Sequence, residues 1–209
     1  MRAYLASLTF LLTGVSYAVD DYIEFQRLDI RSDNRKWISA TVHFVPKKHP
    51  NPDGALNPKF IDEVKIDLYL CFKNTAREKK IYRDTRRRAE LKEILDFYHA
   101  EVEIPTLEVN SRPNSIVFLI PLEIAQRDGF DRVQKAEGYA VDISIGGTSL
   151  ELKEPVVFQS YRDEGILQSF KQQAITNASN TEGTLVPGFL VNPAYLENSP
   201  AVKFPKSSK

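Results

Sequence analysis

The segment 37–45 alternates apolar and polar positions with a period of two. Such alternation predicts a β-strand that buries one of its faces. Its apolar side holds Ile38, Ala40, Val42 and Phe44. Segment 64–73 carries the cleanest alternation in the chain, and we expect it to lie antiparallel beside segment 37–45.

Similar runs recur as far as residue 161. In segment 22–30 the apolar positions change face near Gln26, which predicts a β-bulge. Segment 115–120 is continuously apolar, as expected for a central strand with both faces buried. Pro105 places segment 101–109 at a sheet edge or a bulge, because proline cannot donate a ladder hydrogen bond. Further strands are expected at 139–145, 150–152 and 156–161.

About seven strands separated by turn-forming residues are typical of an immunoglobulin-like antiparallel β-sandwich. We assign this mainly β domain to residues 19–161. The chain has one cysteine, Cys71, so the domain must hold without the disulfide of antibody domains. A short helical turn is expected at 122–127, and Gly129 would end it.

A helical insertion is predicted within residues 74–100, where the strand pattern breaks. The apolar positions follow the spacing of one helical face, at Leu91, Ile94, Leu95 and Tyr98. Thr85 is the expected N-cap, which puts Arg86, Arg87 and Arg88 in the first turn, where the helix dipole disfavours cations. These arginines are either a solvated helix start or the surface that contacts an anionic partner.

The chain begins with the pattern of a cleaved secretory signal, residues 1–18. Arg2 supplies a basic start, Ala3–Val15 is mostly apolar, and Ser16 and Ala18 are small residues before the expected cut. No second long apolar run occurs, so we expect no stable membrane insertion after cleavage. The expected location is the periplasm, the cell surface or the extracellular medium.

Residues 162–209 form a C-terminal appendage. An amphipathic helix is predicted over 163–175. From Leu185 the chain is apolar but broken by prolines, so it cannot form a long helix. This tail either lies as a strap across its own sandwich or adds to the sheet edge of a partner. Its candidate partner contacts are Phe189, Leu190 and Tyr195.

Composition and motifs argue against several classes of function. Twenty-eight lysines and arginines balance twenty-eight acidic residues, which is unlike the basic surface of a nucleic-acid-binding domain. No Gly-x-Ser-x-Gly sequence, phosphate loop or dinucleotide fingerprint is present. The three histidines show no metal-ligand spacing. We therefore predict a protein that is not an enzyme and that uses neither a metal nor a cofactor.

Two alternatives remain open at single residues. Cys71 is a structural thiol, a nucleophile or, in an exported chain, one half of an intermolecular disulfide, and the structural thiol is favoured over the nucleophile. Trp37, Tyr69 and Tyr139 are candidates for a ligand face that binds a glycan or a peptide. The same three aromatic residues could equally belong to the core.

Four features carry a resemblance to a known group of proteins. They are the signal ending at Ala18, the strand 37–45, the insertion around Leu91–Tyr98 and the proline-broken tail at Asn192–Tyr195. In these features the chain resembles the secreted immunoglobulin-like proteins encoded with type IV pilus genes in Akkermansia-type bacteria. The resemblance implies an accessory role in a pilus or cell-envelope assembly, with protein partners, and it carries over no site residue.

Overall fold

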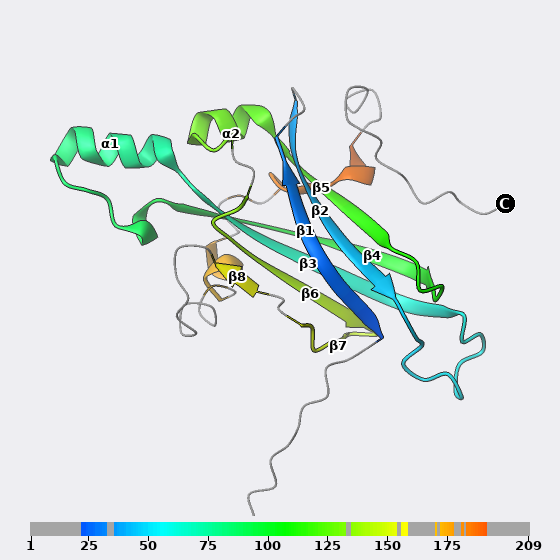
Figure 1. Cartoon of the computed structure of the whole chain (residues 1–209). Coiled ribbons are helices and arrows are strands. Elements are labelled where there is room, and N and C mark those ends of the chain that lie inside the picture. The colour runs from blue at the N-terminus through cyan, green and yellow to red at the C-terminus, as the bar shows by residue number, and fades with distance from the viewer. Residues whose placement is uncertain are drawn as a thin grey trace, which may run out of the picture.

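The computed structural model describes residues 22–32, 36–132, 135–153, 156–158, 170, 172–177, 181 and 183–191 (Figure 1). It is a mainly β structure in which two antiparallel sheets pack face to face, as the sequence predicts. The predicted signal at 1–18 and the candidate contact Tyr195 lie outside the described residues.

The first sheet has the strand order β1-β2-β5-β9. Its strands are β1 (Ile23–Arg31), β2 (Trp37–Pro46), β5 (Asn114–Pro121) and β9 (Val186–Pro187). The second sheet has the order β4-β3-β6-β7, and β8 also pairs with β6. Its strands are β3 (Phe60–Lys73), β4 (Leu95–Glu108), β6 (Gly138–Ile145), β7 (Thr148–Ser149) and β8 (Val156–Phe158).

The order of six of these strands matches that of an immunoglobulin-like sandwich, whereas β9 comes from the C-terminal segment. Lettered in chain order, β1, β2 and β5 correspond to strands A, B and E, and they face β4, β3 and β6, which correspond to C′, C and F. The expected pairing of the segments 37–45 and 64–73 is wrong, because β2 pairs with β1 and β5 whereas β3 lies in the opposite sheet. Alternation identifies a half-buried strand, but the long connection 47–59 allows the chain to cross between the sheets.

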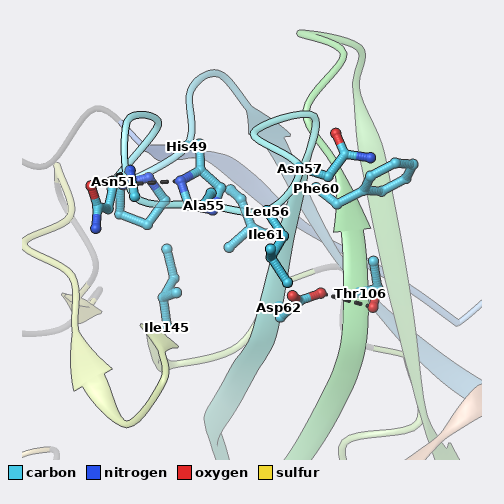
Figure 2. A pocket seen from close by; sticks show the side chains of 12 residues that line it. His49, Asn51, Ala55, Leu56, Asn57, Phe60, Ile61, Asp62, Thr106 and Ile145 are labelled. Carbon is cyan, nitrogen blue, oxygen red and sulfur yellow. Dashed lines mark hydrogen bonds between the residues drawn. The ribbon is translucent and has the colours of Figure 1, made fainter.

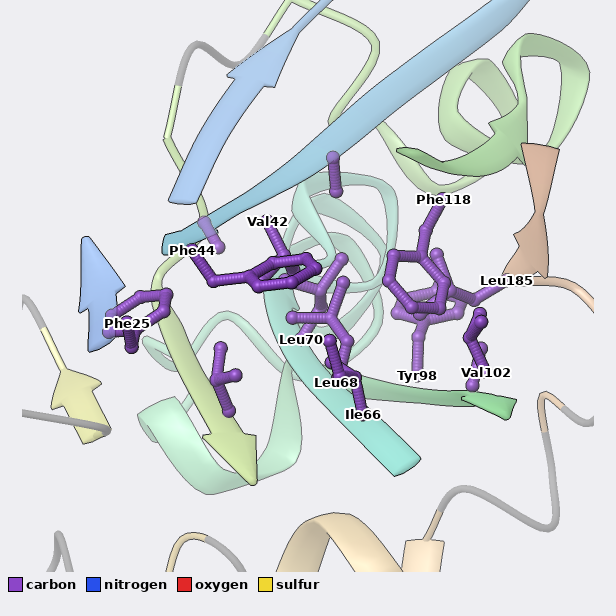
Figure 3. Packing of buried hydrophobic residues seen from close by; sticks show 14 of the residues in the cluster. Phe25, Val42, Phe44, Ile66, Leu68, Leu70, Tyr98, Val102, Phe118 and Leu185 are labelled. Carbon is purple, nitrogen blue, oxygen red and sulfur yellow. The ribbon is translucent and has the colours of Figure 1, made fainter. Parts of the chain in front are cut away.

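The core lies between the two sheets and uses the inward positions that alternation predicts. In β2 these are Ile38, Ala40, Val42 and Phe44, each at most 1% exposed. Side chains of β3 and β4 meet them from the other sheet (Figure 3). At one end of the core, Phe72 stacks on Phe130 with ring centroids 4.6 Å apart, and Tyr98 packs edge-on against both rings.

Several local predictions are confirmed. The register of β1 shifts between Phe25 and Arg27, at the predicted bulge. Pro105 lies in β4, the edge strand of its sheet. α2 (Leu122–Asp128) ends at Gly129, which has a φ of 79°. A Cβ at Gly129 would lie 2.1 Å from the Thr75 hydroxyl oxygen, so any other residue would force Thr75 to move.

The strand predicted at 150–152 is not formed. The chain pairs with β6 as the short β7 and β8, and the segment between them is irregular where the structure describes it. Leu150 and Leu152 nevertheless pack against the core. Of the predicted strand 156–161, the part at 156–158 is β8.

The helix predicted to start at Thr85 is wrong in position. α1 runs from Thr75 to Thr85, capped at its start by buried Asn74, and a short 3-10 turn η1 (Leu91–Glu93) leads into β4. The spacing from Leu91 to Tyr98 fits one face of a helix. Tyr98 is, however, also the first of the alternate positions of β4 that face the core. β3 and β4 pair as far as Lys73 and Leu95, so α1 belongs to the tip of a long hairpin.

Candidate functional site

The tip of the β3–β4 hairpin, residues 75–90, is called the arm below. Figure 1 shows α1 projecting beyond the two sheets. None of the residues of α1 is buried. An isolated helix of this length is marginal in water, because few hydrogen bonds offset the cost of ordering its backbone. The contacts that hold the arm in place are therefore those at its root.

The root of the arm is fixed by a small polar network. The Asn74 side-chain oxygen accepts a hydrogen bond from the Arg77 amide at 2.8 Å, and its nitrogen donates to Asp96 at 2.6 Å. Arg77 also pairs with Asp96 at 2.6 Å. The Thr75 hydroxyl donates to the Gly129 carbonyl at 2.8 Å, which connects α1 to the end of α2.

The arm is strongly basic. It carries seven lysines and arginines against three acidic residues, a net charge of +4. Lys79, Tyr82, Arg83 and the capping residue Arg86 follow the i, i+3, i+4, i+7 spacing of one helical face. The Tyr82 side chain is 57% exposed among these cations. Tyrosine and arginine are the residues that most often contribute large binding energies at protein interfaces.

The three predicted contact arginines lie at the end of α1 and not in its first turn. Arg86 caps the helix in the left-handed conformation, with φ 58°. At this end the helix dipole favours cations. The unfavourable position expected for these arginines, in the first turn of a helix, is therefore wrong. Arg87 pairs with both oxygens of Glu93 at 2.7 and 2.8 Å, and this interaction lowers the pKa of Glu93 to about 2. Arg88 is exposed.

The C-terminal segment 183–191, called the strap below, packs on its own sandwich. Leu185 is 3% exposed and points into the core beside Phe118 (Figure 3). β9 pairs with Phe118 and Leu119 of β5. A Cβ at Gly188 would lie 3.1 Å from the Val117 carbonyl oxygen, so the strap runs close against β5.

The strap ends in the 3-10 turn η3 (Gly188–Leu190), which exposes two large apolar side chains. Phe189 is 52% exposed and Leu190 is 69% exposed. Figure 1 places η3, drawn in orange, on the opposite side of the molecule from α1. The candidate contacts on the arm and on the strap therefore do not form one surface.

The three candidate ligand-face aromatics lie in three different environments. Trp37 is half-buried on the outer face of the first sheet, since its neighbour Ile38 points into the core. Tyr69 is 6% exposed on the outer face of the second sheet. Tyr139 packs against the core and lies 6.4 Å from the Phe25 ring. These residues cannot contact one ligand together.

A cluster of ionisable side chains on the outer face of the second sheet was missed in the sequence. Lys65 and Asp67 come from β3, and His99 and Glu101 come from the neighbouring β4. His99 contacts Asp67 at 2.9 Å and stacks on the Tyr69 ring at 4.4 Å. Asp67, His99 and Glu101 bring their ligand atoms within 4.8 Å of one another, so they could hold a metal ion.

In the structure Lys65 supplies the positive charge of this cluster. Its ammonium nitrogen lies 2.6 Å from Glu101 and 3.7 Å from Asp67, and the hydrogen bond to Glu101 raises the pKa of Lys65. Glu103 and Asp142 add negative charge on the same face. We call Asp67, Glu101, Glu103 and Asp142 the acidic face. Only the register of β3 with β4 and β6 reveals it.

The remainder of this outer face is covered. Cys71, Phe97 and Ala140 pack against Phe170 and Ala174. These two residues are helical and lie within the helix predicted at 163–175, of which the structure describes residue 170 and the part from 172 onwards. Cys71 is fully buried, and burial raises the pKa of its thiol. Such a thiol is unreactive, which agrees with the structural alternative and not with an intermolecular disulfide.

A groove opens between the β2–β3 loop and the turn after β6 (Figure 2). Its volume is about 450 Å³. Apolar side chains of Leu56, Phe60 and Ile145 contribute to its lining, together with His49 and Asp62. The Leu56 side chain is fully exposed, and Phe60 is 37% exposed. The patterns of apolar and polar positions along the chain give no indication of this groove.

Comparison of the chain with protein-family models, with characterised proteins and with solved structures finds no match. Among the described residues, no helix is both long and apolar enough to cross a membrane. We therefore infer function from the surfaces described above.

Proposed function

We propose that the protein is a non-enzymatic interaction module of an exported assembly and that the arm is its contact element. The observation that carries this proposal is a helix with no buried residue, held only at its root, whose exposed face combines Tyr82 with Lys79, Arg83 and Arg86. A folded domain gains little stability from extending such a helix into solvent, because the large apolar side chains that it covers are limited to the half-buried Ile81.

The setting we propose is an accessory role in a type IV pilus-like or cell-envelope assembly. It is supported by the predicted secretory signal at 1–18 and by the resemblance of the chain to pilus-associated secreted proteins. The sandwich supplies a rigid base for the arm, since β3 and β4 remain paired up to Lys73 and Leu95.

Site-specific photocrosslinking tests this proposal in the native envelope fraction of the producing cell. A photoreactive amino acid at Tyr82 is expected to give discrete adducts with a protein partner, and the variant Lys79→Glu/Arg83→Glu should abolish them. The same probe at Trp37, on the outer face of the other sheet, is the matched control. Equal adducts at Tyr82 and Trp37, or adducts that survive the charge reversal, would contradict the proposal.

A second candidate function is peptide binding in the groove beside the β2–β3 loop. Specific support comes from its exposed apolar residues Leu56 and Phe60 beside the polar groups of His49 and Asp62 (Figure 2). Binding pockets commonly combine an apolar lining with a few polar groups that orient the ligand. A glycan is a poorer fit, because Trp37, Tyr69 and Tyr139 are dispersed.

The photoreactive probe placed at Leu56 separates the two candidate functions. Adducts at Leu56 that disappear in the variant Phe60→Ala, with none at Tyr82, would favour the groove. Adducts at Tyr82 alone are the outcome that the arm proposal predicts.

A further inference from the structure

We propose that the partner met by the arm includes a second copy of this chain, whose acidic face receives the basic face of the arm. This inference rests on the proposed function, since it names one partner of the same contact element. The basic face of the arm on one copy consists of Lys79, Tyr82, Arg83 and Arg86. It contacts the acidic face of the other copy, which consists of Asp67, Glu101, Glu103 and Asp142.

Charge complementarity is the first argument. The arm has a net charge of +4. Lys79, Lys80, Arg86 and Arg88 make no ion pair with any other described residue. On the acidic face Lys65 lies close to Asp67 and Glu101, and both Glu101 and Glu103 are exposed. Surfaces of opposite charge attract one another. A partner that carries the same charge as the surface it meets is repelled.

The arm cannot satisfy the acidic face of its own chain. The arm starts after Lys73, whereas the acidic face lies around Lys65 and Asp67 on the same strand. Lys73 lies six positions along the strand from Asp67, which is roughly 20 Å at about 3.3 Å per residue. α1 leads away from the sheets (Figure 1). The contact must therefore form between copies.

The acidic face is carried by neighbouring paired strands. The His99 ring stacks on Tyr69, and this pair occupies the row next to Asp67 and Glu101. The carboxylates project from paired strands, so their positions are fixed before binding. Preorganised groups lose less entropy on association, which favours a specific contact over diffuse attraction.

The balance of charge over the whole chain favours a second copy over a nucleic acid or a lipid surface. Basic and acidic residues are equal in number, and the basic excess of the arm is matched by an acidic excess elsewhere. A polyanion attracted to the arm would be repelled by the acidic face. A second copy presents the complementary surface and no such penalty.

A charge-exchange experiment on the full mature chain tests the inference. Sedimentation velocity at about 0.02 M salt should show association that weakens at least tenfold at about 0.5 M salt, because exposed charges are then screened. Lys79→Glu/Arg83→Glu alone and Glu101→Lys/Glu103→Lys alone should both remain monomeric. An equimolar mixture of these two variants should associate again, since each one then presents the surface that the other has lost.

The matched control is Lys48→Glu/Arg112→Glu, which changes the net charge as much as the arm variant does but lies on loops away from both surfaces. Its association should equal that of the wild type. Circular dichroism and thermal unfolding establish that every variant is folded.

Three results would overturn self-docking. The first is a wild-type chain that remains monomeric at about 1 mM in low salt, a concentration at which even a weak contact populates a complex. The second is association that persists in the arm variant. The third is a mixture of the two variants that does not associate. Arm-dependent binding to anionic vesicles or DNA by a monomeric wild type would assign the arm to that surface instead. If Tyr82 crosslinks in the envelope disappear with the arm variant while the wild type stays monomeric, the proposed function stands and self-docking falls.

Discussion

The arm and the strap are both additions to the strand pattern, but they relate to the core in opposite ways. The strap places Leu185 in the core at 3% exposure and adds β9 to a sheet. The arm buries no residue of α1. Irregular sequence therefore does not by itself mark a functional segment, because one such segment completes the fold and the other extends away from it.

The difference gives each element a distinct expected phenotype. Changes in the strap at Leu185 should alter the free energy of unfolding, because buried apolar area is lost. Changes on the outer half of the arm should alter binding and leave the free energy of unfolding nearly unchanged.

Leu185→Ala should lower the free energy of unfolding by about 2–5 kcal/mol, the range for truncating a buried leucine and leaving a cavity. Urea unfolding followed by Trp37 fluorescence measures it. Leu190→Ala, at an exposed position of the same strap, should stay within about 0.5 kcal/mol of the wild type. Equal losses for the two variants would mean that the strap is not part of the core.

Gly129→Ala should destabilise the root of the arm by about 1–3 kcal/mol, because it combines a left-handed backbone with a clash against Thr75. Gly147→Ala is the matched control, since Gly147 has the same φ of 79° but nothing within 4 Å of an added Cβ. Its cost should reflect backbone strain alone. If chemical unfolding shows the same loss in the free energy of unfolding for both variants, the packing of Gly129 against Thr75 does not contribute to stability.

Tyr69 should make the free energy of unfolding depend on pH above 10. Burial, helped by Asp67 and Asp142, raises the pKa of Tyr69 to about 12 from its usual value near 10. Below pH 10 the phenol is protonated in both states and stability is unaffected. Between about pH 10 and 12 the unfolded chain alone loses the proton, so stability falls. Urea unfolding across this range should show a smaller fall in Tyr69→Phe; identical slopes would contradict the acidic surroundings of Tyr69.

Tyr82→Ala should change the free energy of unfolding by no more than about 0.5 kcal/mol, because the side chain is exposed on the arm. The same substitution should weaken the association of the chain, which sedimentation velocity measures. A large loss of stability without any change in association would place Tyr82 with the strap as a structural residue.

Local sequence signals predicted the parts of the fold that depend on neighbouring residues. The bulge near Gln26, the end of α2 at Gly129 and the edge position of Pro105 each follow from the chemistry of a few adjacent residues. The strands that pair with β3 could not be predicted in this way, because strand pairing depends on contacts between residues distant in sequence. The position of α1 was missed since Tyr98 satisfies both a helical and an alternating pattern.

The candidate site was predictable only in part. The arginines at 86–88 and the pair Phe189 and Leu190 were recognised as departures from the strand pattern, and the structure shows them exposed. The acidic face was not recognised, because Asp67 and Glu101 become neighbours only through the register of β3 with β4. The basic face of α1 likewise required the helix to begin at Thr75.

Amide hydrogen exchange of α1 at low and at high protein concentration tests the central claim most directly. Protection of an amide reports the free energy of the opening that exposes it. In the dilute monomer the amides of Tyr82 and Arg83 should exchange far faster than those of β3, and their protection should rise as the chain associates at low salt. Protection as strong as that of β3 in the dilute monomer, unchanged on concentration, would show that the arm is part of the folded core and would contradict the account.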